Sequence, residues 1–450
     1  MSTSRTNALR LGRRAALLLP LAASLGGCDW IDDIFYDKKT PLPGKRVAVL
    51  GGFTGLDVDP DAKPAITLPP PFANPDWPQP GGTATHEMGH LALPDVVGQA
   101  WRSNIGAGGG YRRKITAQPV VAGGRVFAMD SGGTVSAFAT GNGGRVWELD
   151  TEAEDDRSGN LGGGLSVAGD TLFASTGRGE LLAIEAASGK VRWRKTLGTA
   201  ARAAPTLAEG RAFVPTLDDR MLCFAQDDGR QVWAYQANNA TTAVLGLPSP
   251  AYASGLVIGG FGTGEMIALR ADAGAVAWSD TLAGKGGGAG TLSDLTTVRG
   301  LPVIVGDQVY GTSIGGLTLD NDLRSGRRLW DRAVGSYETP CVAGDWLFLV
   351  STDQQLAALS RADGKVAWVT GLPRWKNEER QRDAIVWHGP VLAGDRLILA
   401  GTNATAISVS PYTGKILGTQ KLSDNASVSP VVAGNTVYLV TDAGSLLALR

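Results

Sequence analysis

The 450-residue chain carries 42 basic and 43 acidic side chains, a near balance that argues against the strongly positive surface of a nucleic-acid-binding protein. Its three cysteines are too few for a disulfide scaffold, and its 62 glycines indicate many tight turns. These numbers favour a globular protein that is built from short elements and has no nucleic-acid partner.

The first 28 residues have the layout of a secretion signal. Four arginines precede an apolar run over residues 15–25, which is too short to span a bilayer and leads into Leu-Gly-Gly-Cys ending at Cys28. This ending resembles a bacterial lipobox, so we predict a lipoprotein signal peptide over residues 1–27 and an acylated Cys28 that anchors the protein to a membrane. An ordinary secretory signal with a stray cysteine is the alternative.

A proline-rich stretch follows the signal. Residues 59–82 read DPDAKPAITLPPPFANPDWPQPGG, with eight prolines in 24 residues, and this composition favours an extended chain. We therefore predict an extended tether over residues 28–84. Its one apolar island, RVAVLGG at residues 46–52, is a short strand or a transient contact rather than a domain.

Residues 85–91, THEMGHL, contain a literal H-E-x-x-H motif. Zinc metalloproteases carry this motif on a helix, where His86 and His90 would share one face and Glu87 would activate water. Prolines and glycines upstream and a proline downstream leave room for no more than a short turn. The remaining histidine, His388, is distant in sequence. We interpret the motif as polar residues on an extended surface segment and predict no metal site.

From residue 130 onward the sequence repeats a unit in which a glycine lies four residues before a tryptophan. Strand-like residues flank the glycine on both sides, so each unit predicts strand, tight turn, strand. In the seventh unit Gly418 takes the place of the tryptophan. The tryptophans are Trp147, Trp193, Trp233, Trp278, Trp330 and Trp368, and the turn glycines are Gly143, Gly189, Gly229, Gly274, Gly326, Gly364 and Gly414.

A further pair of strands precedes each of these hairpins, as in PVVAGNTVYLVTD at residues 430–442. Four short strands in each repeat predict the blades of an all-β propeller. The last unit ends with three strands, and the strand around Trp101 supplies the fourth, with Val97 where the turn glycine would stand. Residues 85–450 thus predict an eight-bladed propeller that is closed by pairing of its N- and C-terminal strands, with THEMGHL along the outer rim of the last blade.

The repeat resembles the tryptophan-docking repeat of quinoprotein dehydrogenases, and the lipobox, tether and eight blades together resemble the BamB family of outer-membrane β-barrel assembly lipoproteins. This resemblance implies that each tryptophan packs between neighbouring blades. It also implies a non-catalytic scaffold, monomeric within a hetero-complex, that is lipid-anchored at the periplasmic face of the outer membrane. Asp29 keeps the inner membrane open as a destination, because in some lipoproteins an aspartate after the acylated cysteine retains the protein there.

The alternative function is that of a periplasmic enzyme that uses pyrroloquinoline quinone. Such alcohol dehydrogenases carry adjacent cysteines, whereas Cys223 and Cys341 stand far apart in apolar runs that favour buried, unpaired thiols. The acidic run at residues 150–156 lacks the glycine and the spacing of a calcium loop. We therefore predict no catalytic residue, metal or cofactor.

The resemblance also implies a partner site on two long connections. Leu292, Asp294 and Leu295 resemble a loop with which BamB proteins bind the barrel-assembly protein BamA, and Val244 and Leu245 lie in the connection one blade earlier. The likeness is incomplete, because the family has an arginine where Leu245 stands and an acid where residue 296 is a threonine. The two leucines of the later loop are alternatively packing residues, and the charged run at residues 374–383 is an alternative partner site.

Overall fold

The computed structural model describes residues 55–62, 65–110, 113–152, 162–201, 203–240, 246–283 and 297–450, which belong to one compact unit over Phe53–Arg450. No helix in these ranges is long and apolar enough to cross a membrane. Some of the residues predicted from the sequence lie outside them: Cys28, Val244, Leu245, Leu292, Asp294 and Leu295.

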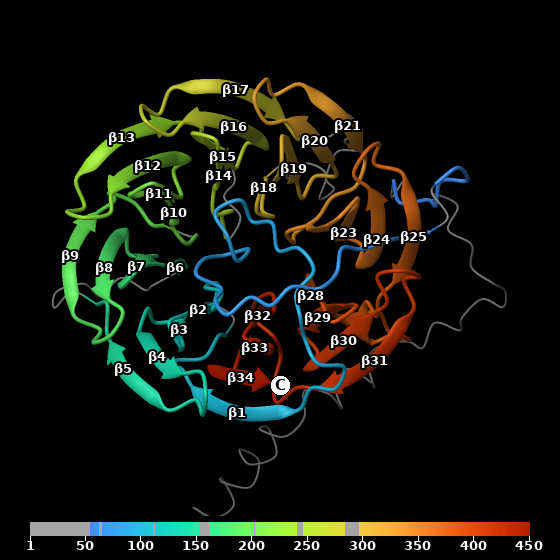
Figure 1. The fold of residues 1–450 in the computed structure, drawn as a ribbon, viewed down its shortest axis with the longest axis horizontal. Coiled ribbons are helices and arrows are strands. Elements are labelled where there is room, and N and C mark those ends of the chain that lie inside the picture. Colours follow the sequence, from blue (N-terminus) through green and yellow to red (C-terminus); the bar gives the residue numbers. More distant parts are fainter. Residues whose placement is uncertain are drawn as a thin grey trace, which may run out of the picture. The chain divides into compact units, whose positions relative to one another are not determined.

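Eight four-stranded antiparallel sheets are arranged as blades around a central axis (Figure 1). The first strand of each sheet is innermost, and the last lies at the rim. Blade 1 consists of β2 (Val120–Ala122), β3 (Arg125–Met129), β4 (Val135–Ala139) and β5 (Arg145–Leu149), and blade 2 of β6 (Gly163–Ala168), β7 (Thr171–Thr176), β8 (Glu180–Glu185) and β9 (Val191–Thr196). Blade 3 consists of β10 (Thr206–Ala208), β11 (Arg211–Pro215), β12 (Arg220–Ala225) and β13 (Gln231–Gln236), and blade 4 of β14 (Ala251–Ala253), β15 (Leu256–Gly260), β16 (Glu265–Arg270) and β17 (Val276–Thr281).

Blades 5 to 8 complete the ring, and a separate two-stranded hairpin, β26 (Trp375–Asn377) and β27 (Arg382–Ala384), interrupts the connection between blades 6 and 7. Blade 5 consists of β18 (Val303–Val305), β19 (Gln308–Thr312), β20 (Thr318–Asp322) and β21 (Arg328–Arg332), and blade 6 of β22 (Cys341–Ala343), β23 (Trp346–Val350), β24 (Gln355–Ser360) and β25 (Val366–Gly371). Blade 7 consists of β28 (Trp387–Ala393), β29 (Arg396–Gly401), β30 (Thr405–Val409) and β31 (Ile416–Lys421), and blade 8 of β32 (Val431–Ala433), β33 (Thr436–Thr441), β34 (Ser445–Leu449) and β1 (Gln99–Asn104).

The residue pattern of a strand follows from its place in the blade. The inner strands are covered on both faces by neighbouring blades, so they are largely apolar, as in β23, WLFLV, where every residue is buried. The outermost strand has one solvated face and alternates instead. In β17, VAWSDT, only Trp278 is buried. Each repeat therefore forms a blade whose inner strands are packed in the core and whose outermost strand has a polar, solvated face.

The ring closes as the sequence predicts. Strand β1 pairs antiparallel with β34, with Trp101 opposite Ala448 and Asn104 opposite Ser445. Blade 8 therefore combines a strand from before the repeats with three strands from the end of the chain, and β34 is paired on both sides. The all-β, eight-bladed propeller is confirmed.

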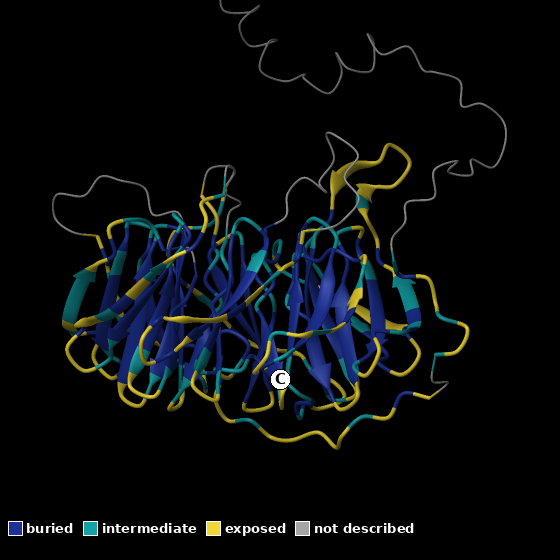
Figure 2. Cartoon of the chain, turned by 90° about the horizontal axis from the view of Figure 1, so that it is seen from above, coloured by how far each residue is buried: buried dark blue, intermediate teal, exposed yellow. Residues whose placement is uncertain are grey.

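The strand order defines two faces. In blades 1 to 7 the connection to the next blade leaves the outermost strand on the same side as the turn between the second and third strands. We call this side the loop face. The turns between the first and second strands lie on the opposite side, which we call the strap face. The sides of the blades are largely buried, and exposure concentrates at the turns (Figure 2).

Residues 65–94, which we call the strap, wind across the centre of the ring on the strap face (Figure 1). Their backbone or side chains hydrogen-bond to the innermost strand of most blades, and Pro69 packs close to Gly344, which follows β22. The hydrogen-bonded pairs are Trp77 with Val121, Pro78 with Val167, Gln79 with Leu207, Ala84 with Tyr252, Thr85 with Ile304, Leu91 with Leu392 and Asn74 with Val432.

The strap corrects the expected start of the propeller. Ile66 is 9% exposed and Trp77 1% exposed, and both belong to the largest hydrophobic core cluster, so residues 65–84 are not a free tether. Proline favours an extended chain and lacks an N–H, which suits a segment that touches many blades without pairing along any one of them. The same prolines that suggested a tether therefore serve a packed segment.

The THEMGHL motif is not helical, as expected, but it is not a regular extended segment, because His86 and Gly89 have φ of 62° and 66°. Its position was also predicted wrongly. It crosses the centre of the strap face rather than the outer rim, and His86 and His90 are 0% and 2% exposed. His86 Nδ1 donates to the Pro302 carbonyl (2.7 Å), and burial lowers the pKa of His86 to about 4. His90 Nδ1 donates to the Pro69 carbonyl (2.8 Å). The two imidazoles thus have separate partners in the core.

Candidate functional site

Tryptophans dock seven of the eight seams between blades. Each indole N–H donates to a backbone carbonyl of the next blade over 2.7–3.2 Å, and most of the rings also pack against an aromatic side chain of their own blade. The pairs of indole and carbonyl are Trp101 with Thr140, Trp147 with Ala186, Trp193 with Gln226, Trp233 with Ala271, Trp278 with Leu323, Trp330 with Arg361 and Trp368 with Pro411.

The turn glycines have a second role that the sequence reasoning missed. Each lies against the indole of the preceding blade, so that a Cβ at Gly274, for example, would be 2.7 Å from the Trp233 ring. Gly274 also has φ +69°, a conformation that favours glycine. The glycine and the tryptophan of one repeat therefore serve two different seams. The glycine contacts the indole of the preceding blade, and the tryptophan four residues later packs against the next blade. Together these contacts fix the blades as a rigid platform.

On the loop face, one turn anchors both connections that carry the expected partner residues. The Asp219 carboxylate accepts hydrogen bonds from Ala240 N (2.9 Å), just before residues 241–245, and from Gly262 N (2.9 Å). Thr297, just after residues 284–296, donates from Oγ1 to the Gly262 carbonyl (3.0 Å). The turn between β15 and β16 that contains Gly262 is therefore a shared base for the two connections.

This anchor depends on a close approach that only glycine permits. A Cβ on Gly262 would be 2.7 Å from the Ala240 Cβ. Asp219 is 5% exposed and has φ 56°, so its carboxylate is held in the gap between blades 3 and 4. Sequence reasoning did not select Asp219, Gly262 or Thr297, because their positions in separate repeats give no signal that they meet.

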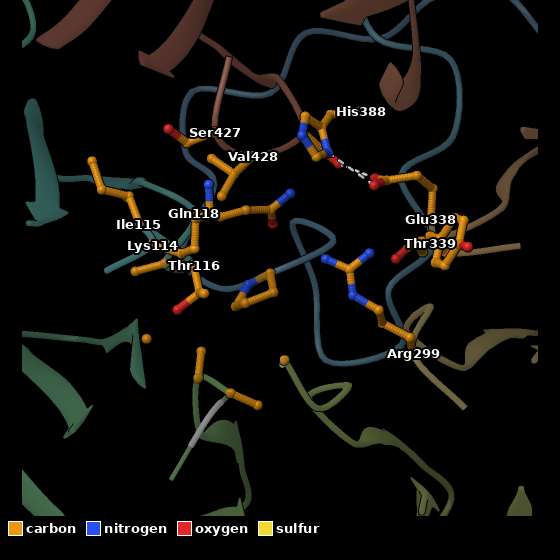
Figure 3. A pocket seen from close by; sticks show the side chains of 18 of the residues that line it. Lys114, Ile115, Thr116, Gln118, Arg299, Glu338, Thr339, His388, Ser427 and Val428 are labelled. Carbon is orange, nitrogen blue, oxygen red and sulfur yellow. Dashed lines mark hydrogen bonds and ion pairs between the residues drawn. The ribbon is translucent and has the colours of Figure 1, made fainter. Parts of the chain in front are cut away.

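A cavity of about 440 Å³ lies at the centre of the ring (Figure 3). Pro80 of the strap contributes to its lining, and the rest comes mainly from segments that lead into the innermost strands of the eight blades. Its charged residues include Lys114, Arg299, Glu338 and Asp442. The Arg299 guanidinium lies over the Tyr337 ring, 5.8 Å from its centroid.

Glu338 in the cavity wall accepts hydrogen bonds from several neighbouring segments. Its carboxylate accepts hydrogen bonds from His388 Nδ1 (2.9 Å), Ser429 Oγ (2.7 Å) and Gly389 N (3.3 Å), so it joins blades 6, 7 and 8. Burial alone would raise the pKa of Glu338, but His388, Arg299 and Ser429 outweigh it and lower the pKa to about 2. The group is therefore an ionised structural tie at neutral pH.

The described residues do not fit a calcium-bound quinone. Glu338 is fully engaged, Asp442 accepts a hydrogen bond from Ser427 (2.8 Å), and no group of three or more His, Cys, Asp or Glu in the described ranges could hold a metal ion. Cys223 and Cys341 are buried in different blades, and burial raises the pKa of both thiols to about 12. Neither thiol is placed or activated for chemistry.

The charged run expected as an alternative partner site forms the β26–β27 hairpin. Its strands are largely exposed, and it stands out from the ring on one side (Figure 2). Trp375 pairs with Ala384 and Asn377 with Arg382. The hairpin is thus a second accessible feature beside the two anchored connections.

Comparisons with known proteins place this geometry among relatives. A family model described as outer membrane protein assembly factor BamB matches residues 131–370 and 369–450. The assembly factor BamB of Shewanella oneidensis is 27% identical over 363 residues, covering 79% of this chain and 88% of the relative. That of Bordetella pertussis is 25% identical over 366 residues, covering 81% and 89%.

Solved structures share the fold. BamB from Moraxella catarrhalis superposes with a TM-score of 0.67 at 20% identity, covering 79% of this chain and all of that one. A quinohemoprotein alcohol dehydrogenase from Comamonas testosteroni gives a TM-score of 0.61 at 13% identity, covering 83% and 80%. At these identities the likeness concerns the propeller alone.

Proposed function

Because this chain belongs to the family of the outer membrane protein assembly factor BamB, we propose that it is a non-catalytic scaffold of outer-membrane β-barrel assembly. The family match, which runs through the repeats to Arg450, is the observation that carries this proposal. The proposal places the protein at the periplasmic face of the outer membrane, as a monomer within a hetero-complex. Binding, rather than chemistry, is its role.

The proposed partner is a BamA-like barrel-assembly protein, held by the two connections on the loop face. Val244 and Leu245 would provide apolar contacts from one connection, and Leu292, Asp294 and Leu295 would contact the partner from the other. Their common anchor at Gly262 supports a joint role, because loops on a rigid scaffold present binding residues with little ordering cost. Asp294 is the charged contact in this proposal.

Asp294→Arg tests the partner site. We expect the melting temperature to stay within a degree or two while co-purification with the BamA-like partner falls at least tenfold, because reversing a charge at an interface affects association more than folding. Asp307→Arg is the matched control: Asp307 is an exposed aspartate in the β18–β19 turn on the opposite face. An unchanged complex with Asp294→Arg would contradict the site and direct attention to the β26–β27 hairpin.

Asp219→Asn tests the anchor separately. The substitution weakens two hydrogen bonds to backbone N–H groups at the base of the connections without changing a proposed contact residue. We expect partner affinity to fall several-fold with unchanged strand content by circular dichroism. Full affinity would show that the connections bind independently of their shared base.

We further propose that acylated Cys28 anchors the protein to the outer membrane. Cys28→Ser should move the protein from the membrane fraction to the soluble periplasm, and density-gradient separation of the two membranes in the wild type tests whether Asp29 diverts it to the inner one. A Cys28→Ser protein that stays in the membrane at its original level would contradict the lipid anchor.

The absence of a cofactor is part of the same proposal. Purified protein should contain neither stoichiometric zinc or calcium by elemental analysis nor a quinone absorbance band, and either finding would contradict the scaffold role. Glu87→Ala should leave partner binding intact. His86→Ala is expected to destabilise the fold, because the ring is buried and hydrogen-bonded to Pro302.

A further inference from the structure

Among the described residues, no tryptophan docks the seam between blades 7 and 8, whereas one docks each of the other seven seams. Strand pairing places Gly418 opposite Ser408 and Ser408 opposite Ile398, which is the row that Trp368, Ala358 and Phe348 occupy in blade 6. A glycine and an isoleucine thus stand where blade 6 has an indole packed on a phenyl ring. The seam has lost most of its aromatic volume.

The blade 8 wall of this seam is also different. Elsewhere the receiving blade supplies a hairpin with a glycine and an acceptor carbonyl, but the outermost strand of blade 8 is β1, which enters from the strap. Residues 95–97 therefore take the place of the hairpin. Val97 packs partly into the core, and Arg396 donates to the backbone carbonyls of Pro94 and Asp95.

A cavity of about 360 Å³ results. Ile398, Val437, Leu439 and Leu449 contribute apolar walls, Gly418 leaves one side open, and the Asp95 residue lies at its edge. Even an engineered apolar cavity of roughly 150 Å³ is large enough to take up benzene. An added Cβ on Gly418 would meet no atom within 4 Å, so the space beside the missing tryptophan is open.

The mouth of this cavity is apolar and exposed. Val96, which lines the cavity, is 86% exposed and is the most exposed large apolar side chain among the described residues. Exposed apolar surface around a cavity is typical of an interaction site. Strand β31 forms the rim beside it and pairs only with β30, so its outer backbone groups are available to an extended peptide.

We propose that the seam between blades 7 and 8 binds an indole, presented as a tryptophan side chain on an extended segment of a partner polypeptide. The seven sister seams argue for this occupant, because each holds an indole between the same two layers of strands. The segment would pair with the edge of β31 and insert its ring beside Gly418, and the exposed Asp95 carboxylate offers an acceptor for the indole N–H. This site lies at the rim, apart from the connections of the proposed function.

The test introduces a tryptophan into the protein so that its indole occupies the cavity. Gly418→Trp restores the repeat, and Gly418 has no positive φ and no close neighbour to oppose the change. The matched control is Gly371→Trp, which adds a tryptophan to the outermost strand of blade 6 at a glycine that also has no atom near its would-be Cβ. If Gly418→Trp does not fold, Ile398→Phe narrows the same cavity.

The probe is N-acetyl-tryptophanamide, compared with N-acetyl-leucinamide. In methyl NMR spectra we expect the tryptophan probe to shift Leu417, Val437 and Leu439 in the wild type and in Gly371→Trp at millimolar concentration. In Gly418→Trp or Ile398→Phe the shifts should fall at least fivefold. The leucine probe should have less than a fifth of the effect.

Four results would overturn the proposal. The first is the absence of any shift in the wild type, which would make the cavity a packing defect only. The second is an equal response to the leucine probe. The third is concentration-dependent dimerisation of the wild type that Gly418→Trp abolishes, which would make a second copy the occupant. The fourth is binding to phosphatidylethanolamine vesicles that Gly418→Trp abolishes, which would assign the seam to lipid.

Discussion

The seven docked seams and the open seam between blades 7 and 8 solve the same packing problem in different ways. At a docked seam, an indole fills the outer part of the wedge and donates a hydrogen bond across it. At the open seam that aromatic is missing, and Glu338, which precedes blade 6, links His388 of blade 7 with Ser429 of blade 8 near the centre of the ring. A propeller can therefore close without a uniform set of seams.

The difference follows from the way in which the ring closes. Blade 8 takes its outermost strand from residues 99–104, so its last strand pair has no hairpin to receive an indole. The strap adds contacts near this seam, including the pairing of Leu91 with Leu392 in β28. Because β1 completes blade 8, one seam has no hairpin against which a tryptophan could pack, and a cavity is left at the rim.

Deletion of residues 95–105 should have the largest effect. It removes β1, the wall of the open seam and Trp101, and it exposes the edge of β34. We expect aggregation or a loss of cooperative urea unfolding, measured by light scattering and circular dichroism. Val96→Ser is the control, since it leaves the strand pairing intact. A deletion protein that unfolds like the wild type would mean that β1 does not hold the ring closed.

Replacing a side chain by alanine should lower the free energy of unfolding far more at a docked seam than at the open seam. Trp233→Ala removes a buried indole and its hydrogen bond, so the free energy of unfolding should fall by about 3–5 kcal/mol. Leu417→Ala, at the exposed mouth of the open seam, should change it by less than about 0.5 kcal/mol. Urea denaturation measures both values. Similar losses at the two positions would remove the distinction between the seams.

Glu338→Gln tests the central tie of the open seam. We expect a loss of about 1–3 kcal/mol at pH 7, because hydrogen bonds to a buried charge are replaced by weaker ones. The pKa of Glu338 is about 2 in the fold, below its usual 4.5, so its contribution is complete above pH 4.5 and is lost as the pH falls toward 2.

The pH dependence separates this tie from other acid effects. The pKa of His86 is lowered to about 4 by burial and not by Glu338, so we expect both proteins to lose stability from that group as the pH falls from 6.5 to 4. The difference between wild type and Glu338→Gln in urea midpoint should therefore shrink as the pH falls below 4.5. A difference that is independent of pH down to 3 would show that the charge of Glu338 contributes nothing to the tie.

The smallest expected effect compares two glycines. Gly274→Ala should lower the free energy of unfolding by about 2 kcal/mol, because the residue has φ +69° and the new methyl would press on Trp233. Gly418→Ala, with open space and no positive φ, should change it by less than about 0.5 kcal/mol. Thermal unfolding of the two variants measures the contrast. Equal effects would mean that indole docking does not constrain the turn glycine.

The propeller itself could be read from local patterns. The spacing of glycine and tryptophan marks a hairpin within one blade, so it is visible in a short window, and the count of strands predicts that β1 completes blade 8. The open seam is visible in the same way, since Gly418 and Val97 break the repeat. The sequence could not show that this break leaves a cavity, because Ile398, Leu439 and Val97 meet only in the folded ring.

The sequence by itself determined the strand repeats, the number of blades and the closure of the ring, because each depends on residues that are close together or on a count of repeats. Only the tertiary structure decided that the strap is part of the core, since its partners such as Val121 and Ile304 come from different blades and produce no periodicity along the strap. The same applies to the anchor at Gly262, where Asp219 and Thr297 converge from separate repeats. The burial of His86 likewise follows from the blades that surround it rather than from its neighbours in the chain.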